Sequence, residues 1–385
     1  MLFKDVPGLQ GVKKILIELV NNNRLPHAVM LRGPEQSVAL PLALALSTYL
    51  HCDNRSGDDS CGTCAACRKT SKHVHPDLHF TYPVIPRKSG DKPVSTDYIN
   101  EWREALIETP FMNYYEWMDK IGAENKQGNI TAEECNQIMH NLNLKAFESR
   151  YKVQLIWLPE YLGNVGNKLL KVLEEPTDNT FFILITEDSE KILNTILSRC
   201  QHFNVPQLAQ TEVTDFMQSK FSISADEAGR IARMADGSIS AALQLQEGIS
   251  TVNEELCLKW FRLCFGLYSK NHANAAAELA PFIDEQLAKS GREKQKSFLK
   301  YCLYMLRESL QLKFTGRCSL SETELPFANH ISKSVDIEQL QKMQRIIEKL
   351  HYHIERNANP KITFFQQTLE LSRVINHMPL LSEAV

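Results

Sequence analysis

The chain has 385 residues, of which 43% are hydrophobic and 23% are charged, as in an ordinary globular protein. A chain of this length is expected to form two or three domains. The net charge of −3 gives no overall basic field, so any contact with nucleic acid has to be local. No apolar run reaches the roughly 18 residues that span a bilayer, and the N-terminus lacks the apolar core of a signal peptide. These features predict a cytoplasmic protein with no membrane partner.

A buried strand at residues 28–31, a turn at Gly33 and an apolar helix follow one another near the N-terminus. This order of elements is typical of a phosphate-binding loop. In the pattern G-x-x-x-x-G-K-[ST], Gly33 takes the first position, and the second glycine, the lysine and the hydroxyl residue fall on Val38, Ala39 and Leu40. Val38 does not let the backbone approach a phosphate as closely as glycine does. Ala39 supplies no positive charge for the phosphates, and Leu40 supplies no oxygen for Mg²⁺. We therefore expect no ATP binding.

Four of the ten cysteines form a cluster with short spacings and turn-forming residues between them. They are Cys52, Cys61, Cys64 and Cys67. Four thiolates close a tetrahedral zinc site, which is then structural because no coordination position stays open. The alternatives are buried thiols or a redox pair, and His73 and His75 lie near enough to compete as ligands.

Residues 83–128 are harder to interpret, because an exposed loop is followed by a partly helical stretch rich in aromatic residues. The aromatic side chains, from Trp102 to Trp117, either stack on nucleic-acid bases or form a local core. After them, Thr131 and Glu134 have the spacing of a helix cap.

From residue 151 strands alternate with helices, which predicts a mainly parallel α/β sheet. The predicted strands are 153–158, 181–186 and 201–205, and a helix over 167–175 ends before a proline. Glu160 follows the first of these strands, at the position where an ATPase carries an acidic pair that holds Mg²⁺. Only one acidic residue is present there.

The rest of the chain is predicted to be helical. Residues 206–248 read as a small helical lid and 249–385 as a helical C-terminal domain, after an α/β domain over residues 1–205. The predicted long helices are 256–268, 275–288 with a break at Pro281, 294–312, 337–356 and 362–378. A polar interruption separates the third and fourth of these helices.

Several motifs in this order resemble the δ′-type subunits of the clamp loader of bacterial DNA polymerase III, a branch of the AAA+ clade. They are Leu25-Pro26-His27-Ala28, the four cysteines, His75-Pro76-Asp77, the run from Asn167 to Pro176, and Thr195-Ile196-Leu197-Ser198-Arg199-Cys200. The resemblance covers residues 1 to about 248, and residues 83–128 are an insertion in its usual pattern. It implies a P-loop-type parallel sheet domain with a small zinc module, a helical lid and an all-helical C-terminal collar domain used for oligomerisation.

The resemblance also implies a function. Such a subunit is a stator that does not hydrolyse ATP, assembles with γ/τ and δ subunits within the polymerase holoenzyme, and helps to load the sliding clamp on primed DNA. Arg199 matches the arginine that acts on a neighbour's nucleotide, where a cation stabilises charge developing on the phosphate. The structural alternative for Arg199 is a surface ion pair. The lid positions Ser240 to Ala242 lack the arginine that senses nucleotide in active relatives.

Two other functions remain open at this point. The first is an ATPase subunit of the same loader, of the γ/τ type, which needs a lysine where Ala39 stands. The second is a zinc-containing nucleic-acid-binding protein that reads bases with its aromatic insertion. A nucleotide titration distinguishes the first from the stator, and DNA binding by the monomer tests the second.

Overall fold

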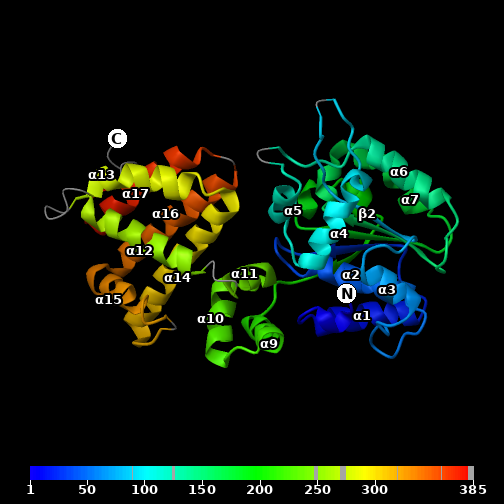
Figure 1. Cartoon of the computed structure of the whole chain (residues 1–385), viewed down its shortest axis with the longest axis horizontal. Coiled ribbons are helices and arrows are strands. Elements are labelled where there is room, and N and C mark those ends of the chain that lie inside the picture. Colours follow the sequence, from blue (N-terminus) through cyan, green and yellow to red (C-terminus); the bar gives the residue numbers. More distant parts are fainter. Residues whose placement is uncertain are drawn as a thin grey trace. The chain divides into compact units, whose positions relative to one another are not determined.

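The computed structural model describes residues 1–88, 90–123, 126–246, 250–268, 275–318, 320–356 and 358–379 (Figure 1). They form two compact units, Met1–Ala242 and Leu243–Val385, each with its own core. The predicted boundary between lid and C-terminal domain, at residues 248–249, lies outside the described residues. Within the described part of the chain, no helix combines the length and hydrophobicity that crossing a membrane requires.

A five-stranded parallel sheet organises the first unit, as the alternation of strands and helices predicted. Its strands are β1 (Ala28–Arg32), β2 (Leu78–Thr81), β3 (Lys152–Trp157), β4 (Thr180–Thr186) and β5 (Gln201–Asn204). They lie side by side in the order β2-β3-β4-β1-β5, so β2 and β5 are the outer strands. In the centre, Met30 lies opposite Leu184 on one side and His202 on the other. All strands point the same way, so their carboxyl ends form one edge of the sheet.

Helices cover both faces of this sheet, which is why its central strands are almost wholly apolar. Helices α1 (Gln10–Asn21) and α2 (Ala39–His51) lie on one face, and α6 (Ala132–Asn143) and α7 (Leu170–Glu174) on the other (Figure 1). Every residue of α2 is buried, so this helix lies inside the core and has no solvent-exposed face. On the opposite face, Ile138 and Leu142 of α6 pack against strand residues such as Phe182.

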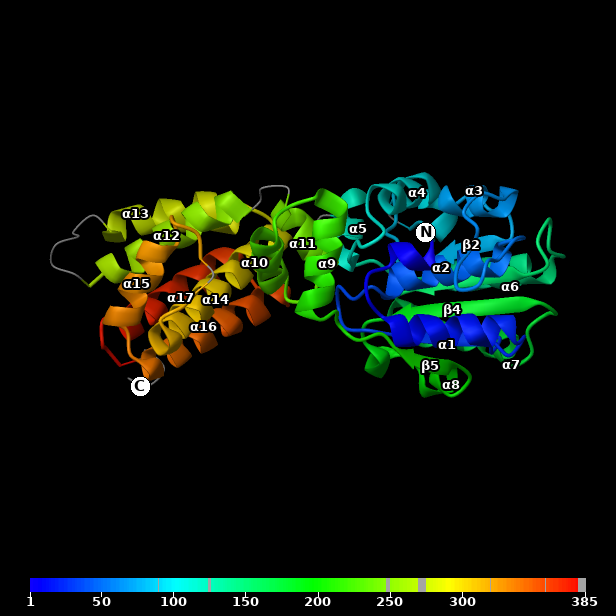
Figure 2. The same cartoon turned by 90° about the horizontal axis from the view of Figure 1, so that it is seen from below.

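Further helices lie before the first strand, between the strands and after β5, the last of them ending just beyond the first unit. They are α3 (Ala65–Ser71), α4 (Ile99–Glu108), α5 (Tyr114–Lys120), α8 (Asn194–Leu197), α9 (Gln210–Phe221), α10 (Ala225–Ala235), α11 (Ile239–Gln244), and the 3₁₀ helices η1 (Phe3–Asp5), η2 (Ser95–Tyr98), η3 (Pro159–Leu169) and η4 (Ser189–Lys191). Helices α9 to α11 (green in Figure 2) follow β5 and make up the segment predicted to be a lid, which is called the lid below, while η2, α4 and α5 lie in the insertion. Thr131 caps α6 as predicted, accepting a hydrogen bond from the Glu134 N–H.

The second unit is a helical bundle. Its helices are α12 (Ser250–Gly266), α13 (Ala275–Pro281), the π-helix η6 (Phe282–Ala288), α14 (Arg292–Thr315), α15 (Leu325–Ser334), α16 (Ile337–Glu355) and α17 (Pro360–Ile375). Trp260, Phe298 and Phe364 meet in its core, and the Trp260 Nε1–H donates to Thr368 Oγ1 at 2.9 Å. This bond satisfies the indole inside an apolar environment.

Three local features differ from the expectations. The helix expected over 167–175 is present and ends before Pro176, but it is a 3₁₀ helix up to Leu169 and an α-helix only from Leu170. The break at Pro281 is absent, because Pro281 keeps helical angles (φ −60°, ψ −40°) and the chain continues directly into η6. Helix α15 was not predicted, since it begins at the end of a polar stretch with a proline in its first turn.

Candidate functional site

The loop after β1, residues 33–38, lies at the carboxyl edge of the sheet. The Gly33 N–H donates to the Thr186 carbonyl at 3.1 Å, which joins the loop to the end of β4. A Cβ atom on Gly33 would lie 2.3 Å from Ser37 Oγ and 2.9 Å from the Val205 carbonyl oxygen. The turn is therefore tight enough to require glycine at this position.

The three positions that depart from the phosphate-binding pattern belong to the core. Val38, Ala39 and Leu40 are only 1%, 3% and 3% exposed, respectively. Helix α2 begins at Ala39, and no side chain caps its first turn. These residues contribute packing, and none of them presents a charge or an oxygen at the edge where the loop lies.

Glu160 stands after β3 at the same edge and holds the neighbouring loop. Its Oε1 accepts hydrogen bonds from the backbone N–H groups of Glu187, at 3.0 Å, and Asp188, at 3.3 Å. Burial raises the pKa of Glu160, and these donors partly offset that effect. The carboxyl group thus fixes the chain that leaves β4.

Arg199 lies at the other edge of the sheet. It lies two residues before the start of β5, whereas residues 33–38 follow the end of the neighbouring parallel strand β1. Its guanidinium donates through Nε to Glu174 Oε1 at 2.9 Å and through Nη1 to the Thr195 carbonyl at 2.7 Å, and Nη2 also pairs with Glu174. The side chain is 27% exposed. The guanidinium is therefore held in place yet remains open to solvent.

The four clustered cysteines come together as the spacing predicted. All four sulfur atoms lie within 4.8 Å of one another. The Cys52 and Cys61 sulfurs are 3.6 Å apart, and those of Cys61 and Cys67 are 3.9 Å apart. Zinc–sulfur bonds of about 2.3 Å in a tetrahedron place the sulfurs about 3.8 Å apart, so this donor set fits Zn²⁺.

Backbone geometry supports the same fit. The Cys61 N–H points at Cys52 Sγ, at 3.3 Å, and the Cys64 N–H at Cys61 Sγ, also at 3.3 Å. Backbone donors from Thr63 and Cys64 lower the pKa of Cys61 to about 6, whereas burial raises the pKa values of the Cys52 and Cys67 thiols. A bound cation would hold all four together as thiolates.

The N-terminal segment fastens this cysteine module to the sheet domain. The Asp59 carboxylate accepts from the backbone N–H groups of Phe3 and Lys4, both at 2.9 Å. The Phe3 ring packs on Tyr49 of α2, with the ring centroids 5.6 Å apart. Arg55 caps the end of α2 by donating to two backbone carbonyls of that helix. The module is thus an ordered extension of α2.

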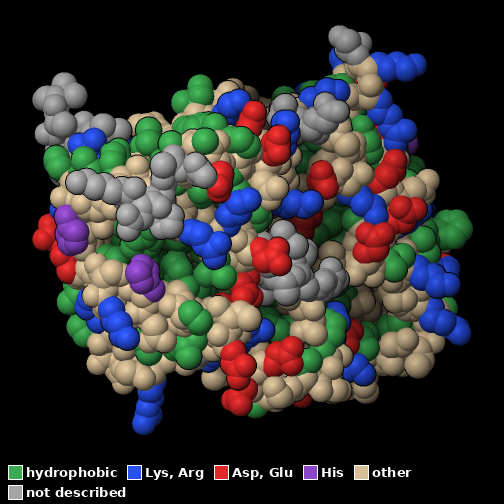
Figure 3. All heavy atoms as spheres, turned by 60° about the vertical axis from the view of Figure 1, so that its left-hand side comes forward, with side chains coloured by type: hydrophobic (Ala, Val, Ile, Leu, Met, Phe, Trp, Pro, Cys, Tyr) green, Lys and Arg blue, Asp and Glu red, His purple; other side chains and the backbone are tan. Residues whose placement is uncertain are grey.

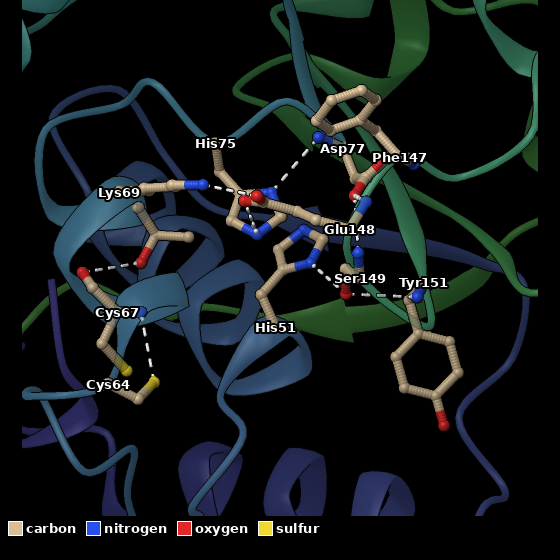
Figure 4. A network of polar contacts seen from close by, with 11 residues as sticks. His51, Cys64, Cys67, Lys69, His75, Asp77, Phe147, Glu148, Ser149 and Tyr151 are labelled. Atoms are coloured by element: carbon tan, nitrogen blue, oxygen red, sulfur yellow. Dashed lines mark hydrogen bonds and ion pairs between the residues drawn. The ribbon is translucent and has the colours of Figure 1, made fainter.

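The histidines beside the module are engaged elsewhere and do not complete it (Figure 4). The rings of His51 and His75 stack with centroids 4.2 Å apart. His51 Nδ1 contacts Ser149 Oγ at 2.9 Å, and His75 Nδ1 accepts from the Asp77 N–H at 3.2 Å. Asp77 in turn binds three consecutive backbone N–H groups, of residues 147–149. This network ties α2 to the segment that enters β3.

The aromatic side chains of the insertion form a local core. Trp102 and Trp117 are fully buried, and Trp102 stacks on Tyr82 with ring centroids 3.9 Å apart. Trp157 of β3 completes the cluster, 5.2 Å from Trp102. Buried rings have no free face for a base, so this cluster is no reading surface for nucleic acid.

Surface charge gives no further sign of a nucleic-acid site on the visible face. In Figure 3, Lys and Arg side chains alternate with Asp and Glu and gather into no continuous basic field. This agrees with the small net charge of the chain.

Comparison with known proteins identifies the family. A family model described as "DNA polymerase III, delta subunit" matches residues 8–209. The chain belongs to this family. It is similar to DNA polymerase III subunit δ′ of Escherichia coli (strain K12), with 27% identity over 287 residues, which are 71% of this chain and 72% of that protein.

Two further proteins align along most of the chain. DNA polymerase III subunit tau of Bacillus subtilis (strain 168) is 23% identical over 386 residues, 94% of this chain and 60% of that protein. A solved structure from Thermotoga maritima, titled a DNA polymerase III gamma subunit-related protein, covers 95% of this chain and 99% of its own at 14% identity, with a TM-score of 0.38. Both δ′ and tau subunits are thus among the relatives.

The partner of Arg199 was not predicted. The structure shows Arg199 in an ion pair, which was the structural alternative for this residue, and Glu174 is the partner. The two residues are 25 positions apart, and no spacing rule in a single sequence connects them. Only the packing of α7 beside α8 brings them together.

Proposed function

We propose that the chain is a δ′-type stator of the clamp loader of DNA polymerase III. In this role it assembles with γ/τ and δ subunits and helps them to load the sliding clamp on primed DNA. It holds one structural Zn²⁺ through the four clustered cysteines, binds no ATP itself, and supplies Arg199 to a nucleotide held by a neighbour. Family membership supports the general assignment, and the position of Arg199 supports the specific one.

The observation that carries this proposal is the separation of Arg199 from its own loop. A parallel strand of about five residues is about 16 Å long, so the arginine and residues 33–38 are kept apart at opposite edges. The loop itself offers buried apolar side chains at positions 38–40. Arg199 cannot reach residues 33–38 of its own chain, and that loop lacks the lysine that binds phosphate. Arg199 is therefore suited to act on a nucleotide bound by another subunit.

Phosphoryl transfer needs charge stabilisation and little other chemistry from the protein. The Glu174 carboxylate and the Thr195 carbonyl orient the Arg199 guanidinium before any partner arrives. Such preorganisation lowers the cost of ordering the side chain when the complex forms. Its bidentate fork then meets phosphate oxygens that a lysine would meet only as a point charge.

The decisive experiment is ATP hydrolysis and clamp loading by a reconstituted loader that carries Arg199→Ala. The variant is expected to fold and assemble, because a partly exposed ion pair contributes about 1 kcal/mol or less. Hydrolysis at the interface it serves should fall by about a thousandfold, so total ATPase falls partly and loading falls further. Arg199→Lys should rescue poorly.

Arg150→Ala is the matched control, because Arg150 is also exposed and contacts the ring of Tyr151. Loaders with this variant should hydrolyse ATP and load clamps at the unmodified rate. If Arg199→Ala loaders do the same, Arg199 is a surface residue and the proposal of a finger in trans is wrong.

A γ/τ-type ATPase is the second candidate, because the tau relative aligns with 94% of this chain. It requires Mg²⁺-dependent nucleotide binding by the isolated chain. The third candidate is a zinc-containing nucleic-acid-binding protein. The aromatic side chains that would stack on bases are buried in the core, which counts against it. It would still be supported by tight binding of the monomer to DNA.

A further inference from the structure

The described part of the insertion, residues 83–128, is attached to the sheet domain at several points. The backbones of Val84 and Asn129 bond each other in both directions, at 3.0 and 2.9 Å, which closes its base. Tyr114 of α5 stacks on Tyr161 of η3, with ring centroids 4.7 Å apart. The Trp117 Nε1–H donates to the Pro83 carbonyl at 2.7 Å. Helix α5 is therefore fixed both to the insertion's own base and to the sheet domain.

The same helix and the residues before it also contact the lid. The Phe111 ring packs edge-on against Phe216 of α9, with centroids 5.5 Å apart. The Ser240 hydroxyl of α11 donates to Glu116 Oε1 of α5 at 2.7 Å. Phe111 is 6% and Ser240 is 5% exposed, so both contacts are sheltered from water. Two lid helices are thus held by one insertion.

Glu116 serves both partners at once. Its second oxygen, Oε2, accepts from the Asn113 N–H at 2.7 Å and completes the capping box of α5. The carboxylate is therefore held in one orientation by the start of its own helix. A lid that rotated away would break the bond between the buried Ser240 hydroxyl and this half-buried carboxylate, and losing that bond costs free energy.

The topology explains why the insertion can reach the lid. The insertion follows the carboxyl end of β2 and the lid follows the carboxyl end of β5, and these are the two outer strands of the sheet. Contact between them spans the whole carboxyl edge. We propose that residues 83–128 are a brace that locks the lid to the sheet domain and prevents it from moving as a hinged body. This proposal does not rest on the clamp-loader role.

Amide hydrogen exchange on the full-length protein tests the brace. Ser240→Ala and Phe216→Ala act from the lid side and leave the insertion's capping box intact. Removing a hydrogen bond to a charged acceptor should raise exchange in peptides from α10 and α11 about tenfold, and the double variant should raise it further across α9 as well. Exchange in the central strands β1, β3 and β4 should stay unchanged.

Ser219→Ala is the matched control, because Ser219 is an exposed serine of the same lid and bonds only the Phe216 carbonyl of its own helix. It should leave exchange in α10 and α11 at the wild-type rate. A double variant of Ser240 and Phe216 whose lid exchanges no faster than that of Ser219→Ala overturns the brace. A rise in the strands as well would mean general destabilisation, and would also count against it. Neither result depends on ATP hydrolysis, so the stator proposal is judged separately.

Discussion

Two ionisable side chains near the cysteine module, Asp77 and His73, are buried, and the structure favours the charged form of the first and the neutral form of the second. Asp77 is 3% exposed, and although burial alone would raise its pKa, three backbone N–H donors hold that pKa below the usual value. His73 is 6% exposed, and burial lowers its pKa to about 4. The aspartate is therefore kept charged and the histidine neutral. Their titrations both act on stability, in the same direction on acidification.

His73 provides the clearer pH prediction. The unfolded chain binds a proton at this residue near pH 6.5, whereas the folded chain does so only near pH 4. Stability linked to His73 is therefore present above pH 6.5 and is lost as the pH falls from 6.5 towards 4. Between pH 7 and 5 the loss amounts to about 2 kcal/mol. Urea unfolding of the wild type at pH 7 and pH 5 measures this loss of unfolding free energy together with the contributions of the other ionisable groups.

The variant His73→Asn isolates this contribution. His73 has a positive φ of 56°, a conformation that asparagine tolerates better than most residues, so the backbone is preserved. The variant should lose about 2 kcal/mol less than the wild type on going from pH 7 to 5. Equal losses in the two proteins would show that His73 is not buried as a neutral side chain.

At this scale, sequence-local sites were predictable and long-range pairs were not. The four cysteines lie within 16 positions, so their spacing alone predicted the cluster that the structure contains. The pairing of Glu174 with Arg199 and of Glu116 with Ser240 depends on how distant elements pack. A single sequence carries no signal for such pairs.

Among the elements, the buried strands were predicted best. The apolar character of β1, β3 and β4 is typical of a parallel sheet covered on both faces, and these strands lie within one residue of expectation at each end. The outer strand β5 is mostly polar and partly exposed, and its bounds also lie within one residue of expectation. Errors concentrate where helix type changes, at η3 and η6, because the sequence pattern of a 3₁₀ or π turn hardly differs from that of an α turn.

The cysteine module is expected to behave as one metal-dependent element. Cys64→Ser should remove most of the bound zinc and lower the free energy of unfolding of the sheet domain. The reason is that the free energy of metal binding contributes to the stability of the folded state at such a site. The residue also caps α3, accepting from the Cys67 N–H at 3.4 Å, so α3 should lose order with the metal. Elemental analysis and thermal unfolding of protein purified without chelator measure both effects.

Cys318→Ser is the control, since Cys318 is a partly exposed thiol outside the cluster. It should retain one zinc per chain and an unchanged melting temperature. Wild-type protein without zinc, or a Cys64→Ser variant with full zinc content, would contradict a four-thiolate site.

For the molecule as a whole, the carboxyl edge of the sheet is where a nucleotide would bind, and here it is shaped by packing. Buried side chains at positions 38–40, the engaged Glu160 carboxyl and the insertion's contacts to the lid all lie at this edge. Each favours a fixed arrangement over one that responds to a ligand.

The isolated chain is therefore expected to show no measurable ATP affinity by calorimetry, with or without Mg²⁺. Ala39→Lys should not create a site. Ala39 is 3% exposed, so the new ammonium group would be placed in the core beside Val38 and Leu40. Burying an unpaired charge there should cost about 3 kcal/mol or more and lower the melting temperature.

Ala225→Lys makes the same change at the first residue of α10, where the side chain is exposed, and should leave stability nearly unaltered. The comparison separates the two explanations for a missing lysine. If Ala39→Lys is as stable as Ala225→Lys and binds ATP with Mg²⁺, the loop is an open phosphate site that lacks one charge. If it is unstable and binds nothing, the loop is part of the core and cannot be turned into a phosphate site by one charge.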